Sequence, residues 1–143
     1  MTVVKSIGVP VVALVCLVAL TACGGAGPTP TSAFPKYTAE QVIAKIQPLG
    51  VTGVKPGTRT ADTLSPNTYT DNQEFTITSI APKGGQVMIF ESATDVAGMQ
   101  AWFARFPDLA PYVYVKGNAL VQLNSGLPKV EAEKFREALN TLP

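Results

Sequence analysis

Side chains able to do acid–base or nucleophilic chemistry are few in this 143-residue chain. It has no histidine, which excludes Ser-His-Asp and Cys-His catalysis, histidine zinc sites and a histidine pH switch. Glu91 and Asp95 are the best candidates for a paired acid and base, because they flank a predicted strand-to-helix junction. A solvated strand end and a helix cap explain the same two residues without catalysis. We therefore predict no catalytic residue, no metal site and no cofactor.

Cysteine carries the other reactive group, and the chain has only Cys16 and Cys23. Cys16 lies inside a mainly apolar stretch of 14 residues, 7–20, which is shorter than the roughly 20 residues of a membrane span but typical of an export signal. Residues 20–23 read Leu-Thr-Ala-Cys and resemble the lipobox of bacterial lipoproteins. The resemblance implies cleavage between Ala22 and Cys23, with fatty acyl chains such as palmitate attached to Cys23.

These observations divide the chain into three parts. We expect a lipoprotein signal peptide over 1–22, the lipidated cysteine with a flexible tether over 23–37, and one domain over 38–143. The tether is rich in small residues and proline, and a flexible chain of that length reaches about 20 Å. The protein is then held on the extracytoplasmic face of the cell membrane, because two acyl chains anchor stably. An ordinary, secreted protein cut after Ala22 is the alternative.

The charge of the chain limits its partners. Eleven basic and ten acidic residues give a formal net charge of +1, and one of the basic residues, Lys5, lies in the expected signal peptide. A neutral body without a basic cluster argues against nucleic acid as a partner. It also argues against electrostatic binding to a membrane surface, so the lipid on Cys23 is the expected membrane contact.

Hydrophobic periodicity and turn residues predict the elements that would position any site. The expected elements are a helix over 38–48, an irregular segment over 50–72 with a candidate short strand near 51–54, strands over 75–81 and 86–91, a helix from Ser92 or Thr94 to just before Pro107, strands over 112–116 and 119–124, and a helix over 129–141. This order predicts an α+β fold: a four-stranded antiparallel sheet made of two ββα units, with a preceding N-terminal helix.

Both faces of the predicted sheet are apolar. In the second hairpin, Gly117-Asn118 is the turn, which places Tyr112, Tyr114, Val121 and Leu123 on one face and Val113, Val115 and Leu120 on the other. In the first hairpin we expect Phe75, Ile77, Met88 and Phe90 on one side and Ile80, Val87 and Ile89 on the other. Either helix 38–48 or the segment 50–72 covers the second face, or the face with Tyr112, Tyr114, Val121 and Leu123 is an exposed binding surface.

Most of the chain after the expected tether resembles a family of small secreted lipoproteins from high-GC Gram-positive bacteria. The resemblance rests on Pro-Asn-Thr-Tyr-Thr at 66–70, Val-Met-Ile-Phe-Glu-Ser-Ala-Thr-Asp at 87–95 and Tyr-Val-Lys-Gly-Asn-Ala-Leu-Val-Gln-Leu at 114–123. These motifs are structural, so the resemblance implies an envelope location and no particular activity. The chain departs from that family before its last helix, where Leu127-Pro128 replaces the usual Ser or Thr cap.

The sequence thus favours a membrane-anchored binding or accessory module of the cell envelope. Its partner would be an envelope protein or a small apolar ligand. A cell-envelope enzyme that uses carboxylates and a purely structural spacer are the two alternatives.

The last predicted helix, 129–141, should bury Val130, Phe135, Ala138, Leu139 and Leu142.

Overall fold

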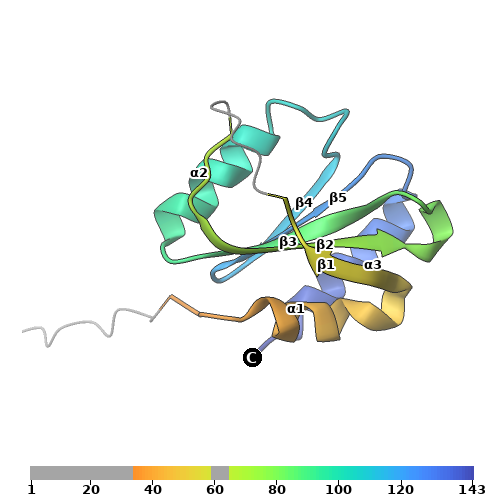
Figure 1. The fold of residues 1–143 in the computed structure, drawn as a ribbon, viewed down its shortest axis with the longest axis horizontal. Helices are drawn as coiled ribbons and strands as arrows, with labels where there is room; N and C mark the ends of the chain where they lie inside the picture. The colour runs from red at the N-terminus through yellow and green to blue at the C-terminus, as the bar shows by residue number, and fades with distance from the viewer. Residues whose placement is uncertain (1–33, 59–64) are drawn as a thin grey trace, which may run out of the picture. The chain divides into compact units, whose positions relative to one another are not determined.

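The computed structural model describes residues 34–58 and 65–143, which form an α+β domain around one antiparallel sheet (Figure 1). The sheet has five strands in the order β1-β2-β3-β5-β4. The strands are β1 Val51–Pro56, β2 Tyr69–Ile77, β3 Gly84–Phe90, β4 Tyr112–Lys116 and β5 Ala119–Leu123. The helices are α1 Ala39–Ile46, α2 Ala93–Phe103 and α3 Lys129–Asn140, with short 3-10 helices η1 Gln47–Leu49 and η2 Thr78–Ile80.

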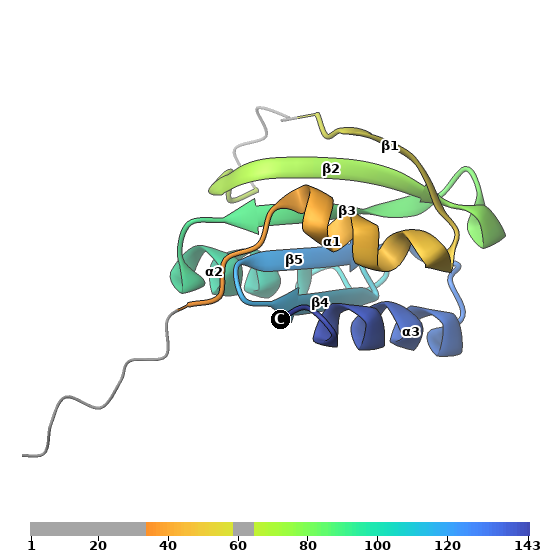
Figure 2. The same ribbon diagram turned by 90° about the horizontal axis from the view of Figure 1, so that it is seen from below.

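Helices lie on both faces of the sheet. Figures 1 and 2 show α1 and α3 on one face and α2 on the other. Along β3, Val87 and Ile89 join the core under α1 and α3, whereas Met88 and Phe90 join the core under α2. This alternation follows from the two-residue period of a strand. The apolar character of both faces is therefore explained by two layers of helix, one on each side.

The start of α1 is confirmed as predicted. Thr38 accepts a hydrogen bond from the backbone of Gln41, and the Gln41 side chain accepts one from the backbone of Thr38. This reciprocal capping box satisfies two backbone donors that a helix start leaves free. The helix continues into η1 and stops at Gly50, whose φ of 85° is the left-handed conformation that glycine adopts without strain.

The prediction of an irregular segment over 50–72 is largely wrong, and the sheet has five strands instead of four. The candidate strand near 51–54 is real and extends to Pro56 as β1, an edge strand that pairs with β2. β2 begins at Tyr69, six residues before the predicted start. Residues 71–74 within it are Asp-Asn-Gln-Glu, and strands are depleted in aspartate, asparagine and, to a lesser degree, glutamate. Pairing with β3 overrides that preference.

The predicted register of the first hairpin is also wrong. Phe75 lies opposite Gly85, so Phe75 and Ile77 share a face with Val87 and Ile89, not with Met88 and Phe90. The chain forms η2 directly after Ile77, so β2 ends four residues earlier than predicted and the connection is longer. A register shift of one residue moves every side chain of a strand to the opposite face.

The second hairpin is confirmed, with Tyr112 opposite Leu123 and Tyr114 opposite Val121. Gly117 has a φ of 54°, which suits the first position of its two-residue turn.

The last helix is confirmed within one residue, but its predicted buried face is partly wrong. Phe135, Leu139 and Leu142 are buried, while Val130 is 75% exposed. Val130 lies five residues before Phe135 and therefore about 140° away around the helix. Ala132 takes the buried position instead.

Both predicted ββα units are present, as β2-β3-α2 and β4-β5-α3. Their helices nevertheless pack on opposite faces of the sheet (Figure 2). The central strands β3 and β5 are antiparallel, so a two-fold axis that exchanges the two strand pairs must be perpendicular to the sheet. Such an axis would place both helices on the same face. The two units therefore share a chain order but not a symmetric arrangement.

The domain begins earlier than residue 38, which corrects the end of the tether expected over 23–37. Tyr37 is buried in the core, and Phe34 packs against the core under α2. Asn118, in the second hairpin turn, holds this segment: its backbone N–H donates to Pro35 O at 2.9 Å, and its side chain bonds the backbone N–H and carbonyl of Tyr37 at 2.5 and 3.1 Å. We call residues 34–37 the entry strap.

Candidate functional site

The predicted modification site is not in the described part of the chain. Ala22 and Cys23, the signal peptide 1–22 and the tether up to residue 33 all lie outside the described residues. Cleavage and lipidation at Cys23 therefore remain predictions from the sequence.

The tyrosine-bearing face is not the exposed surface that the sequence allowed. Val121 and Leu123 have no exposed surface, and Tyr112 and Tyr114 are half-buried against the core under α1 and α3. The Tyr112 hydroxyl donates to Leu127 O at 3.1 Å, and the Tyr114 hydroxyl donates to the Glu133 carboxylate at 3.4 Å. Helices cover this face, so the expectation of an exposed tyrosine patch is wrong.

The two carboxylates at the junction of β3 and α2 each have another partner. Glu91 is exposed and forms an ion pair with Lys36 of the entry strap at 3.0 Å. Asp95 accepts a hydrogen bond from the Ser92 hydroxyl at 2.6 Å, and the same hydroxyl accepts one from the Asp95 backbone N–H. Glu91 is thus a solvated strand end with an exposed ion pair, and Asp95 lies in the first turn of α2, bonded to the cap Ser92.

A polar row crosses the sheet on the face that carries α2. Lys55 of β1 lies opposite Glu74 of β2, Glu74 opposite Gln86 of β3, and Gln86 opposite Gln122 of β5. We call these four residues the polar row. One pleat further along the same face lie Met88 and Leu120, which pack under α2. The helix thus covers the apolar part of this face, and the polar row lies beside it.

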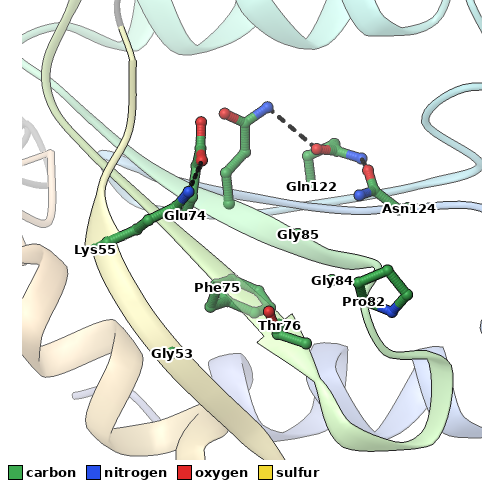
Figure 3. Close-up of a pocket in the computed structure, with 11 residues that line it drawn as sticks. Gly53, Lys55, Glu74, Phe75, Thr76, Pro82, Gly84, Gly85, Gln122 and Asn124 are labelled. Carbon is green, nitrogen blue, oxygen red and sulfur yellow. Dashed lines mark hydrogen bonds and ion pairs between the residues drawn. The ribbon is translucent and has the colours of Figure 1, made fainter.

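The side chains of the polar row form two bonded groups. Gln86 Nε2 donates to Gln122 Oε1 at 3.1 Å, and Gln122 Nε2 donates to Asn124 Oδ1 at 2.9 Å. At the other end, Lys55 Nζ and Glu74 Oε2 are 3.5 Å apart. Figure 3 shows these two groups rising from the sheet, with Lys55 and Glu74 on one side and Gln122 with Asn124 on the other. The row is therefore an ordered hydrogen-bonding surface with compensated charge.

Two neighbouring cavities lie over this row, and we call them together the amide groove. The first, of about 250 Å³, is drawn in Figure 3 and lies over the polar row and the start of β3. The second, also about 250 Å³, extends toward α2 and is lined by Asn72, Met88, Trp102 and Phe103 among others. Gln86, Gln122 and Asn124 line both cavities, so the two lie side by side along a shared wall.

Asn72 is the most unusual group in the groove. Its side chain is 8% exposed, and its Oδ1 atom has no hydrogen-bond partner among the protein atoms described. Buried polar atoms are nearly always paired, because an unpaired acceptor loses its hydration without compensation. The Asn72 side chain packs against Gly57, so this acceptor is buried beside the cavity and does not open onto it.

The aromatic wall of the groove is held by α2 and the residues after it. Trp102 is half-buried, with its ring centroid 5.0 Å from that of Phe103 in an edge-on arrangement. The Phe106 ring is also 5.0 Å from Trp102, on a tilted plane. These two neighbours fix the indole beside the cavity while leaving part of it accessible. Trp102 was not singled out as a site residue by the sequence.

Other sites were sought in the described part of the chain. Across residues 34–58 and 65–143, no group of three or more histidine, cysteine, aspartate or glutamate side chains is arranged to hold a metal ion. No helix in the same residues is long and apolar enough to cross a membrane. The amide groove is therefore the best candidate site for recognition in the described domain.

Comparison with known proteins adds no assignment. No protein-family model, no curated protein and no solved structure matches the chain. The function must therefore be inferred from its own residues and geometry.

Proposed function

We propose that this chain is a membrane-anchored extracytoplasmic lipoprotein whose folded domain is a binding module of the cell envelope. The amide groove carries the proposal for the domain. It is a polar, partly aromatic hollow on a sheet that helices otherwise cover, and the linked amides of Gln86, Gln122 and Asn124 line it. Concave sites with a few fixed polar groups are the usual form of small-ligand sites.

The groove supports binding better than catalysis. The only ionised groups among its described lining residues are Lys55 and Glu74, and these form an ion pair with each other. A general acid–base pair requires two groups with separated pKa values that both reach a substrate. Amides such as Gln122 and Asn124 instead donate and accept hydrogen bonds without exchanging protons at neutral pH.

The membrane anchor in this proposal rests on the sequence alone. Leu-Thr-Ala-Cys after an apolar stretch supports lipid attachment at Cys23, and residues 24–33 would connect that cysteine to the entry strap. The ordered strap supports a mechanical role for this connection, because Asn118 and the core hold it where the chain enters the domain.

The anchor is tested on protein purified from the membranes of cells that express the full chain. Mass spectrometry of the N-terminal peptide should show a diacylglyceryl-modified Cys23 as the first residue. A Cys23→Ser variant should move from the detergent phase to the aqueous phase on partition. Native protein with an unmodified cysteine, or a serine variant that stays in the detergent phase, would contradict the anchor.

The binding role is tested by cosedimentation of the full chain, in detergent micelles, with washed cell-wall fragments. Gln122→Leu, which breaks the amide chain, should reduce retention by about tenfold, a loss worth about 1.4 kcal/mol. Gln100→Leu is the matched control, because Gln100 is an exposed amide on α2 that lines neither cavity of the amide groove. Equal retention of both variants and the unmodified protein would show that the groove binds nothing in the wall.

A further inference from the structure

We infer that the amide groove recognises a neutral oligosaccharide. This inference rests on the proposed binding function and adds the chemical class of the ligand. It depends on three features of the described residues: charge compensation, amide lining and an aromatic wall.

The charge of the groove indicates an uncharged ligand. Among the described lining residues, only Lys55 and Glu74 have ionised side chains, and at 3.5 Å their opposite charges offset each other. Sites for phosphate or carboxylate ligands present arginine, lysine or helix N-termini instead. A ligand that is polar but neutral fits this lining.

The amides match hydroxyl groups in particular. A carboxamide has donors and acceptors side by side, and neighbouring sugar hydroxyls also donate and accept, so one amide can form two hydrogen bonds with a sugar edge. Gln86, Gln122 and Asn124 are already linked, and each link consumes one donor and one acceptor. The linked amides are thereby fixed in direction, with hydrogen-bonding capacity left at both ends of the chain.

The second cavity offers both kinds of contact that a sugar ring makes. Trp102 lines it, and the C–H face of a sugar ring packs flat against an indole. Gln86, Gln122 and Asn124 line the same cavity, and their amides can bond the hydroxyl edge of that ring.

The dimensions of the groove favour more than one sugar unit. Each cavity has about 250 Å³, below the roughly 300–1,000 Å³ of a site for a drug-sized ligand. The shared wall of Gln86, Gln122 and Asn124 joins them into two adjacent subsites. A chain of sugars can occupy both, with the aromatic subsite near α2 and the amide subsite over the polar row.

The test uses the only tryptophan of the chain, Trp102, as its reporter. Full-length lipidated protein in detergent micelles is titrated with short linear oligosaccharides of glucose, of mannose and of galactose. At least one series should change the tryptophan emission in a saturable way, and added salt should leave the affinity unchanged, because an uncharged ligand is not screened. No saturable change with any of the three series would overturn the inference.

Variants locate the bound sugar in the groove. Asn124→Leu should weaken affinity about tenfold, and Gln100→Leu should leave it unchanged. Trp102→Ala should abolish binding to an immobilised form of the same oligosaccharide. Asn124 is half-buried at the rim, so its variant should keep its cooperative unfolding. Equal affinity of the Asn124 variant and the unmodified protein would contradict a groove site.

Titration with peptides distinguishes failure of the saccharide inference from failure of the proposed binding function. Cell-wall peptides released by digestion are titrated in the same assay. If they bind through Gln122 and the sugars do not, the saccharide inference fails and the binding module stands. If neither class binds and wall retention is insensitive to Gln122→Leu, both fail.

Discussion

The two faces of the sheet are built on different chemistry. Under α1 and α3, the inward side chains of the central strands are apolar throughout, from Val87 to Leu123. Under α2, Met88 and Leu120 are apolar, but the next row on the same strands is Gln86 and Gln122. The change takes place within one pleat, beside the helix that covers the apolar row. A polar pair inside an otherwise apolar pair of strands thus marks the place where the sheet is available to a ligand.

The largest expected effect is a difference in stability between variants at two adjacent residues that point to opposite faces of the sheet. Leu123→Ala, on the face under α1 and α3, should cost about 2–5 kcal/mol of unfolding free energy, because it opens a cavity in a closed core. Gln122→Leu, one residue away on the groove face, should cost less than about 1 kcal/mol, since its partners Gln86 and Asn124 are half-buried. Urea unfolding of both variants measures the difference. Comparable losses would show that the groove face is as tightly packed as the other.

The entry strap joins the two faces, because Tyr37 belongs to one core and Phe34 packs against the other. Asn118→Ala removes the side-chain hydrogen bonds to Tyr37 and Phe90 and should cost about 2–3 kcal/mol. Hydrogen exchange at the Tyr37 amide should accelerate more than exchange in the central strands. Lys36→Ala is the control, since its exposed ion pair with Glu91 contributes little. An unchanged exchange rate at Tyr37 in the Asn118 variant would contradict the role of the strap.

The helices α2 and α3, which lie on opposite faces, also differ in how they start. Ser92 caps α2, whereas α3 begins after Pro128 with no side-chain cap. Ser92→Ala should therefore destabilise the protein by about 1 kcal/mol. Pro128→Ser should add a cap and stabilise it by a few tenths to about 1 kcal/mol. Thermal unfolding of the two variants should shift in opposite directions, and a shift in the same direction would contradict this description of the helix starts.

The smallest expected effect concerns Tyr114 on the closed face. Burial, followed by the charge of Glu133 and the hydrogen bond to it, raises the pKa of the Tyr114 phenol from 10.0 to about 12. A phenol whose pKa is higher in the folded state favours folding below its unfolded pKa, and that contribution is lost as the pH rises from 10 through 12. Tyr114→Phe should reduce the loss of stability over this range, as measured by urea unfolding at several pH values. Glu133→Gln should lower the pKa of Tyr114 in an ultraviolet titration, and an unchanged value would contradict the assigned cause.

Local signals in the sequence were sufficient for the elements that depend on local chemistry. The capping box at Thr38 and Gln41, the cap at Ser92 and the turn at Gly117-Asn118 each involve residues within a few positions of one another. These features predicted α1, α2 and the second hairpin. The polar first half of β2 could not be predicted in the same way, because only its neighbours β1 and β3 make it a strand.

The candidate site was harder to predict for the same reason. Gln86 and Gln122 are 36 positions apart, and their contact depends on the pairing of β3 with β5, which no local pattern specifies. A glutamine inside each of two apolar strands was the available signal. It was outweighed by the tyrosines of β4, which the helices cover. Asn72 carried no signal, because its burial depends on β2 starting at Tyr69.

The most direct test of the account is to map the bound ligand onto one face of the sheet. The full-length protein, labelled with nitrogen-15 and kept in micelles, is examined by nuclear magnetic resonance with and without soluble fragments of the cell wall. We predict shifts in the side-chain amide signals of Asn72, Gln86, Gln122 and Asn124, and none around Tyr114. Shifts confined to the residues around Tyr114 and α3, with the groove amides unchanged, would contradict the account.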